Sequence, residues 1–143
     1  MKQISKYALL IVLLVLLYLL ISGNLLSFSP FVILAQLAAV ALSIWARRSF
    51  QPDQFSIHAE PQKEHLLAQG PYQFIRHPMY ASALLLIWSG ILAHFTLITL
   101  IVGLIATGAI TVRVNIEEEY LRKSLPAYGA YAGKTKRLIP FII

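Results

Sequence analysis

Long apolar segments alternate with polar blocks along this chain of 143 residues. Four uncharged apolar stretches stand out, at residues 7–22, 31–46, 79–93 and 96–112. A helix that crosses the hydrocarbon core of a bilayer needs about 20 residues, with a range of roughly 17 to 25. Flanking apolar residues such as Ile4, Leu25 and Phe28 lengthen the first two stretches. The pattern predicts an all-α integral membrane bundle of four transmembrane helices, of which the third is the shortest.

The composition supports a membrane protein. Hydrophobic residues make up 58% of the chain and charged residues 13%, whereas about a quarter of the residues of a soluble domain are charged. Cysteine is absent, which excludes disulfides and thiolate metal ligands. The histidines show no close ligand spacing, so we expect no metal site; they are His58, His65, His77 and His94. The length suits a single membrane domain over residues 1–143.

Basic residues are confined to one side of the predicted membrane. Lysine and arginine are retained on the cytoplasmic side of short loops, and with four spans all twelve of them fall on the same side. The two opposite loops, residues 23–30 and 94–96, contain no Lys, Arg, Asp or Glu. We therefore predict a multi-pass protein with both termini in the cytoplasm. The net charge of +6 is explained by this topology and by contact with anionic lipid, so no nucleic-acid partner is expected.

The first apolar stretch has a second interpretation. Lys2 and Lys6 precede it, as basic residues precede the apolar core of a signal peptide. No small-residue cleavage pattern follows, and Leu25, Leu26 and Phe28 continue the apolar character. We therefore expect this stretch to remain in the mature protein as a transmembrane helix.

The polar blocks on the predicted cytoplasmic side hold all six acidic residues. Residues 47–76 contain Pro52 and Pro61 and no sustained period, which is typical of irregular structure on a membrane face. Residues 113–143 continue the last helix as far as Pro126 and then read as a turn, a short amphipathic piece and an apolar end at the interface. Any chemistry is therefore expected on the cytoplasmic side, in this loop and this tail.

The string "GPYQFIRHPMY", residues 70 to 80, stands at the start of the third apolar stretch. Pro78 disfavours helix at His77 but is well tolerated as the first residue of a helix, so we predict that the third helix begins there. Its first turn exposes N–H groups and a partial positive charge beside Arg76 and His77, which favours an anion site at the membrane face. Alternatively, Arg76 extends to lipid headgroups, His77 caps the helix and the tyrosines form an aromatic belt.

A second polar string, "RVNIEEE", follows the fourth apolar stretch. Arg113 and Glu117 are four residues apart and share one helix face, so they form a candidate functional pair or simply a surface ion pair. Three consecutive carboxylates repel one another, which indicates that at least one has a cationic partner elsewhere in the chain. Glu118 points about a third of a turn away from Glu117 and is the weaker candidate.

Taken together, these strings resemble a known family. "GPYQFIRHPMY", a short helical hairpin, the carboxylate block and a tail with paired tyrosines and "RLIP" are similar to the isoprenylcysteine carboxyl methyltransferase and phospholipid methyltransferase superfamily of integral membrane enzymes. The tail residues concerned are Arg113, Glu117, Glu118, Leu121, Tyr128, Tyr131 and Arg137 to Pro140. The resemblance covers about residues 62 to 143. It implies S-adenosylmethionine as the cofactor and a lipophilic methyl acceptor that enters from the bilayer.

The resemblance also implies roles for individual residues. It implies that residues 1–48 form two N-terminal spans and that residues 49–143 form a cofactor-binding region with a helical hairpin. The implied cofactor contacts are Glu64, His65, Leu66, Leu67, Tyr72, His77, Pro78, Met79, Tyr80 and Glu117. The implied acceptor contacts are Arg113 and Arg76, and the residues expected to carry catalysis are Arg113 and Glu117. Glu64 stands where relatives often carry histidine, and Leu125 and Pro126 replace the usual "FG", which are departures from the family pattern.

The chemistry of methyl transfer fits these residue types independently of the resemblance. A sulfonium donor already activates its methyl group, so the protein contributes mainly proximity and orientation. Aromatic faces such as Tyr72 or Tyr80 stabilise a sulfonium, and Glu117 can accept hydrogen bonds from hydroxyl or ammonium groups. Arg113 can hold an acceptor carboxylate in a bidentate contact. A carboxylate acceptor is ionised at neutral pH and needs no general base. The sequence offers no compelling general base, which favours methyl-ester formation.

Two other functions remain open at this point. One is an NADPH-dependent membrane reductase of the sterol-reductase type, against which three carboxylates near a 2′-phosphate argue. The other is a small non-catalytic membrane protein, such as a transporter subunit or a scaffold. A transporter would need polar residues inside its spans, and the first apolar stretch has none except tyrosines and a terminal serine, which argues against transport. The acceptor, the atom methylated and the oligomeric state stay undetermined by the sequence.

Overall fold

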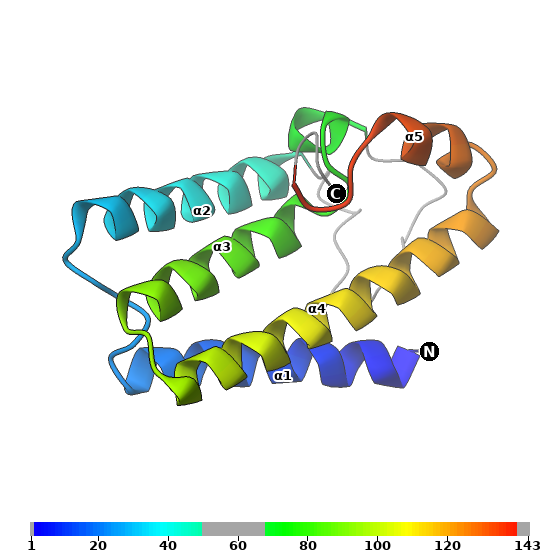
Figure 1. Ribbon diagram of the computed structural model, residues 1–143. Helices are drawn as coiled ribbons and strands as arrows, with labels where there is room; N and C mark the ends of the chain where they lie inside the picture. Colours follow the sequence, from blue (N-terminus) through cyan, green and yellow to red (C-terminus); the bar gives the residue numbers. More distant parts are fainter. Residues whose placement is uncertain (1, 50–67, 140–143) are drawn as a thin grey trace.

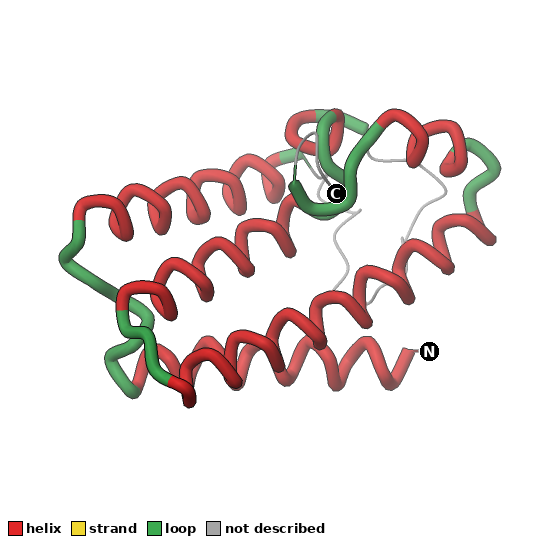
Figure 2. The backbone as a smooth tube through the Cα atoms, viewed as in Figure 1, coloured by secondary structure: helices red, strands yellow, loops and turns green. Residues whose placement is uncertain are grey.

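The computed structural model describes residues 2–49 and 68–139, and within them the chain is helical, with no strand (Figures 1 and 2). The elements are α1 (Lys2–Ile21), α2 (Pro30–Arg48), the 3₁₀ turn η1 (Gly70–Gln73), α3 (Pro78–Ala93), α4 (Leu97–Ser124) and α5 (Tyr128–Lys134). The prediction of an all-α membrane bundle is confirmed. The expected irregular structure of the loop between α2 and α3 falls largely on residues 50–67, outside the described part.

Three of the helices are long and apolar enough to cross a membrane, over Ile4–Ile21, Pro30–Arg48 and Leu97–Ser124. The helix that corresponds to the third predicted span, α3, has 16 residues and so measures about 24 Å, less than the roughly 30 Å of a hydrocarbon core. It is short because Pro78 sets its start and the turn at residues 94–96 sets its end. By contrast, α4 has 28 residues, so its charged last turns extend beyond such a core.

The helices associate as two pairs that meet through α3 and α4 (Figure 1). The first helix, α1, packs along α4, although these two segments are far apart in the sequence, and α2 packs along α3. The buried residues of α1 recur at spacings of three and four, which places them on one helix face; they are Ala8, Val12, Val15 and Leu19. Together with Leu25, Ile87, Ile91, Ala106, Ala109, Ile110 and Val114 they form the core.

Two glycines allow close approach inside the bundle. A Cβ atom on Gly90 would lie 2.5 Å from the carbonyl oxygen of Leu25, so this position keeps the loop before α2 against α3. A Cβ atom on Gly103 would lie 2.6 Å from Ile91 Cδ1. Small residues at helix contacts are typical of membrane bundles, in which close backbone packing replaces the hydrophobic driving force.

Polar bonds also join the elements of the uncharged half of the bundle. Trp88 Nε1 of α3 donates to Thr107 Oγ1 of α4 at 3.1 Å. At the turn between these helices, Nε2 of His94 lies 2.8 Å from the carbonyl oxygen of Leu26. Thr96 caps α4 through a reciprocal pair of hydrogen bonds with Thr99, the arrangement of a capping box. These bonds fix α3 and α4 relative to each other and to the loop before α2.

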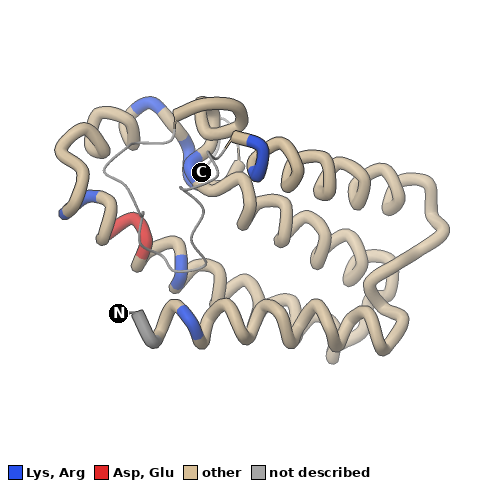
Figure 3. The backbone as a smooth tube through the Cα atoms, turned by 180° about the vertical axis from the view of Figure 1, so that it is seen from behind, with Lys and Arg blue, Asp and Glu red and all other residues tan. Residues whose placement is uncertain are grey.

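Charge is distributed unevenly over the molecule. Figure 3 shows lysine, arginine and the three adjacent glutamates in the half that holds the N-terminus and α5, while the opposite half has no charged residue in the described part. The outward faces of α1 and α2 are apolar, with exposed residues that include Leu13, Leu17, Leu34 and Leu37. An apolar outer surface with charges at one end is the pattern expected of a bundle surrounded by lipid.

Candidate functional site

The start of α3 is where the sequence predicts it. Pro78 is the first residue of the helix and His77 is its N-cap, without a side-chain capping bond. Before it, Gly70 has a φ of 57°, a left-handed conformation that glycine adopts without strain. A Cβ atom there would lie 2.2 Å from Ser49 Oγ, so glycine also allows η1 to lie against the end of α2.

The C-terminal tail returns to the start of α3. The backbone N–H of Arg76 donates to the carbonyl of Lys136 at 2.7 Å, and that of His77 donates to the carbonyl of Arg137 at 3.0 Å. The backbone N–H of Lys136 donates in turn to the carbonyl of Phe74 at 3.1 Å. Lys136 and Ile75 thereby form an isolated parallel β-bridge. These bonds place residues 135–137 directly beside the histidine and arginine of the motif.

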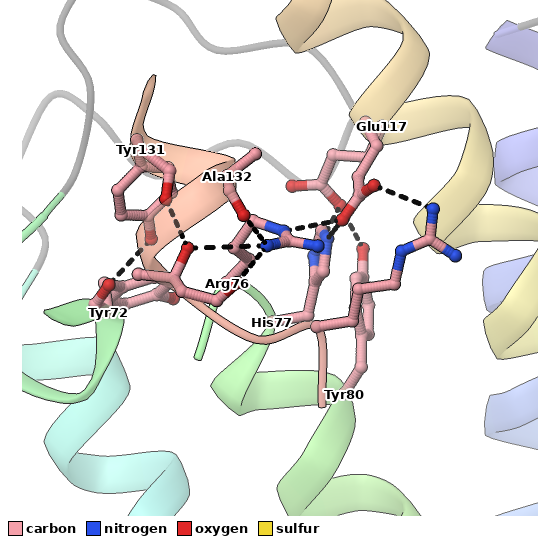
Figure 4. Close-up of polar contacts among 10 residues, drawn as sticks. Tyr72, Arg76, His77, Tyr80, Glu117, Tyr131 and Ala132 are labelled. Atoms are coloured by element: carbon pink, nitrogen blue, oxygen red, sulfur yellow. Dashed lines mark hydrogen bonds and ion pairs between the residues drawn. The ribbon is translucent and has the colours of Figure 1, made fainter. Parts of the chain in front are cut away.

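Arg76 joins three parts of the molecule (Figure 4). Its Nε donates to Glu118 Oε1 of α4 at 2.8 Å. Its Nη1 donates to the carbonyl of Ala132 at 2.8 Å and to that of Thr135. Those carbonyls belong to the last turn of α5 and to its C-cap residue, Thr135, where a cation is favoured by the unpaired carbonyls and the helix dipole. The side chain is 9% exposed, so Arg76 ties α3, α4 and α5 together from the inside.

Glu118 is the buried carboxylate of the site. The residue is 2% exposed, and three side chains from two other segments surround it. Its Oε1 accepts from Arg76, and His77 Nε2 lies 3.3 Å from the same oxygen; its Oε2 lies 3.1 Å from Arg137 Nη2. Because an ionised carboxylate can only accept, His77 Nε2 carries the hydrogen in this contact. The sequence placed Glu118 second to Glu117, whereas the structure gives it the larger number of charged partners.

Glu117 has different surroundings, although it is the adjacent residue. Its side chain is 28% exposed. The hydroxyl of Tyr80, on α3, donates to Glu117 Oε2 at 2.8 Å and accepts a hydrogen bond of 2.6 Å from Arg113 Nε. The connection between Arg113 and Glu117 that the structure shows therefore runs through Tyr80, across two helices, and differs from the direct surface ion pair that was the simpler interpretation of their spacing.

Arg113 lies inside the bundle and is 6% exposed. Besides Tyr80, it contacts α1: its Nη1 donates to the carbonyl of Ser5 at 2.8 Å and to Ser5 Oγ at 3.0 Å. Its guanidinium carbon also lies 5.8 Å from the centre of the Tyr80 ring, within the range of a cation–π contact. The guanidinium thus links the N-terminal helix to the motif at the start of α3.

Aromatic rings line the same region. The rings of His77 and Tyr80 are stacked with centroids 5.6 Å apart, and the Tyr131 hydroxyl donates to the carbonyl of Tyr72 at 2.7 Å. Burial raises the pKa of the Tyr72 phenol, and it raises the pKa of Tyr131 to about 12, so both phenols are neutral at physiological pH. Tyr128 is 1% exposed, and its hydroxyl has no hydrogen-bond partner within the described residues.

Most of the residues predicted for the site lie together. The start of α3, the polar turn of α4 and the tail after α5 bring Arg76, His77, Tyr80 and Glu117 into one network (Figure 4). Arg113 joins this network through its hydrogen bond to Tyr80. Pro78 and Met79 contribute as the first residues of α3, and Tyr72 joins through Tyr131. The predicted contacts Glu64, His65, Leu66 and Leu67 lie outside the described residues.

The structure adds residues that sequence reasoning did not assign to the site. Ser5 and Arg137 are the clearest, because each contacts a site residue from a segment distant in the sequence. Arg137 and Tyr128 were noted only as part of the tail pattern. No local signal identifies Ser5: its contact with Arg113 depends on the packing of α1 against α4, which the hydrophobic pattern does not specify.

Comparison with known proteins identifies the larger part of the chain. Residues 19–128 match a family model described as phospholipid methyltransferase. The match includes the motif at the start of α3 and the whole of α4. The comparison with curated proteins gave no match.

Proposed function

This chain belongs to the phospholipid methyltransferase family, and we propose that it transfers a methyl group from S-adenosylmethionine to a lipophilic acceptor at the cytoplasmic face of a membrane. Membership of the family makes it a membrane methyltransferase. The identity of the cofactor, the residues that bind it and the class of acceptor are the parts that we propose.

One observation supports the proposal above the others: two segments separated by about 40 residues meet in a single polar network. Tyr80 donates to Glu117 across 37 positions, and His77 lies against Glu118 across 41 positions. A bundle held together only by apolar packing has no need to place these groups together. Perturbed and interlinked polar residues at the mouth of a helix are typical of a binding site.

The residues present fit S-adenosylmethionine. Glu117 offers a half-buried carboxylate that can accept from a ribose hydroxyl or an ammonium group. The rings of Tyr72 and Tyr80 can face a sulfonium. The buried Tyr128 hydroxyl, which lacks a partner in the described part, can bond a polar ligand atom. We propose His77, Pro78 and Met79 as further contacts, through the first turn of α3.

When bound, this cofactor supplies a methyl group already activated by its sulfonium, so the protein has to bind, orient and exclude water. Glu117 is proposed to fix the cofactor. Arg113 is proposed to orient the acceptor, and a guanidinium suits an anionic group such as a carboxylate. Arg76 was expected to contact the acceptor as well; because its Nε and Nη1 donate to Glu118 and to α5, we propose that it positions these elements instead.

Cofactor binding tests the proposal first. Titration of S-adenosylhomocysteine into the protein in lipid nanodiscs should release or absorb heat, and His77→Ala should weaken the binding. His94→Ala is the matched control, because His94 lies at the turn between α3 and α4, at the opposite end of α3. Binding of NADPH, with none of the methyl-donor product, would contradict the proposal and favour a reductase.

Methyl transfer tests it second. Lipid extracts are incubated with the protein and with S-adenosylmethionine that carries a labelled methyl group, and the products are analysed by mass spectrometry. A labelled lipid identifies the acceptor class and the atom methylated. Absence of a labelled product from every extract, with cofactor binding intact, would contradict the lipophilic acceptor and leave the cofactor assignment standing.

The charge distribution supports the proposed cytoplasmic placement of the site (Figure 3). Reporter fusions after residue 26, after residue 60 and at the C-terminus are expected to report outside, inside and inside. An outside result at residue 60 would contradict the proposed topology.

A further inference from the structure

The Tyr80 hydroxyl lies between the two charged residues proposed to orient acceptor and cofactor. Arg113 Nε is 2.6 Å from this oxygen and Glu117 Oε2 is 2.8 Å from it. Arginine can only donate and an ionised carboxylate can only accept. The direction of both bonds is therefore determined: the phenol oxygen accepts from Arg113, and the single phenol proton is donated to Glu117.

Two side chains lie close to the ring that carries this hydroxyl. His77 stacks on it with a centroid distance of 5.6 Å, and Arg113 lies 5.8 Å from its centre. The ring belongs to α3, while both charged residues belong to α4. The Tyr80 hydroxyl of α3 thus lies between the side chains of Arg113 and Glu117, which share one face of α4.

Arg113 and Glu117 would otherwise meet directly. Residues four apart on a helix have neighbouring side chains, and an arginine and a glutamate at this spacing attract each other. Away from bulk water the attraction is stronger than on an exposed helix. Without the hydroxyl, the carboxylate and the guanidinium would be drawn into a direct pair, and each would be less available to a ligand.

We infer that the Tyr80 hydroxyl is a positioning group that keeps Arg113 and Glu117 apart and in fixed orientations, so that each can contact its own ligand. This inference rests on the proposed function for the identity of those ligands. It assigns to the hydroxyl a role distinct from any contact that the ring makes with a sulfonium. It also explains why the two helices that carry the site need a polar connection at this level.

The test compares the affinity for S-adenosylhomocysteine of single and double variants in lipid nanodiscs. Tyr80→Phe removes the hydroxyl, keeps the ring, and is expected to lower the affinity about tenfold, the size of one net hydrogen bond to a charged group. Arg113→Gln alone is expected to change the affinity less than about threefold. Gln carries no charge, so it cannot form a direct ion pair with Glu117 that would compete with the ligand. In the double variant the affinity is expected to return to that of Arg113→Gln.

Two results would overturn the inference. If the double variant binds as weakly as Tyr80→Phe, the hydroxyl acts on the ligand or on folding and does not act through Arg113. The matched control is Tyr120→Phe, the same chemical change on α4 at a tyrosine outside the described hydrogen bonds; an equal loss there would also contradict a role specific to Tyr80. Failure of the unmodified protein to bind S-adenosylhomocysteine would instead overturn the proposed function, on which the inference depends.

Discussion

Glu117 and Glu118 are adjacent on α4, yet they belong to clusters with different surroundings. Glu118 is enclosed by Arg76, His77 and Arg137 and is 2% exposed. Glu117 is 28% exposed at its side chain and receives its hydrogen bond from Tyr80, which in turn connects to Arg113. His77 lies between the two glutamates, because its Nδ1 is 3.9 Å from Glu117 Oε2. We call the first group the Glu118 cluster and the second the Glu117 cluster.

The difference separates two tasks that a polar site has to perform. A buried carboxylate with several cationic neighbours holds segments together, because removal of any one partner leaves an uncompensated charge. A carboxylate that remains partly exposed can still accept a hydrogen bond from a ligand. The Glu118 cluster connects α3, α4 and the tail, and we propose that the Glu117 cluster contacts the ligands. Side by side in the sequence, the two glutamates are expected to respond differently to substitution.

The largest effect is expected from Arg76→Ala in the Glu118 cluster. The change removes a partner of a buried carboxylate and leaves the carbonyls of Ala132 and Thr135 without their donor. Breaking such a buried pair from one side costs about 3 to 5 kcal/mol. Thermal unfolding in detergent measures it, with the exposed Arg48→Ala as the control. An unchanged unfolding temperature together with lost activity would move Arg76 from positioning to ligand contact.

The next effect is expected from Arg113→Ala in the Glu117 cluster. If Arg113 orients the acceptor, methyl transfer should fall by about 10²-fold, as loss of an electrostatic contact to the reacting groups typically does, while most of the cofactor affinity remains. Arg113→Lys should rescue poorly, because an ammonium cannot reproduce the planar guanidinium. Rates of transfer and cofactor affinity are measured on the same preparations. Near-normal transfer by Arg113→Ala would remove Arg113 from the mechanism.

A pair of matched substitutions tests the comparison directly. Glu117→Gln is expected to weaken S-adenosylhomocysteine binding by about 1.5 to 3 kcal/mol, the contribution of a hydrogen bond to a charged group, and to leave the unfolding temperature nearly unchanged. Glu118→Gln is expected to do the reverse, because it leaves Arg76 without its carboxylate partner. Calorimetry and thermal unfolding of both variants decide it. Equal behaviour of the two variants would contradict the division into two clusters.

The smallest effect is expected from Lys123→Ala. Lys123 pairs with Glu119 at 2.5 Å on the same helix, but both side chains are exposed. Exposed pairs contribute little, because water screens them and two long side chains lose freedom. Neither unfolding temperature nor cofactor affinity should change measurably in this variant. A clear loss would show that charge at this end of the molecule matters beyond the two clusters.

The hydrophobic pattern predicted the helices well. The apolar stretches at residues 31–46 and 79–93 lie within α2 and α3, and the expected helical continuation past residue 113 ends at Ser124, just before Pro126. Uninterrupted apolar composition and helix-ending residues are local properties, so the sequence contains them directly. The lengths of the first two helices were less well predicted: Ile4 lies within α1, but Leu25 and Phe28 lie between α1 and α2 and lengthen neither helix.

The sequence indicates which strings hold the candidate site residues, but not how their side chains connect. The resemblance assigned residues of the motif at the start of α3 and of the carboxylate block of α4 to the same cofactor, and Figure 4 shows residues of both strings in one network. The assignments of Glu117 above Glu118, and of Arg76 to the acceptor, depended on which neighbours each side chain faces. Those neighbours include Thr135 and Arg137 of the tail and Ser5 of α1. Long-range packing decides these contacts, and a single sequence does not record it.

The pairing of α1 with α4 has a consequence for how the protein is made. α1 leaves the ribosome before α2 and α3, and α4 is synthesised last of the four. At about 5 to 20 residues per second, the 75 residues between Ile21 and Leu97 correspond to a delay on the order of ten seconds. Throughout that interval the face of α1 that carries Ala8 and Val15 lacks α4, its partner in the folded bundle. Completion of the site by the contact of Arg113 with Ser5 therefore belongs to the final stage of membrane assembly.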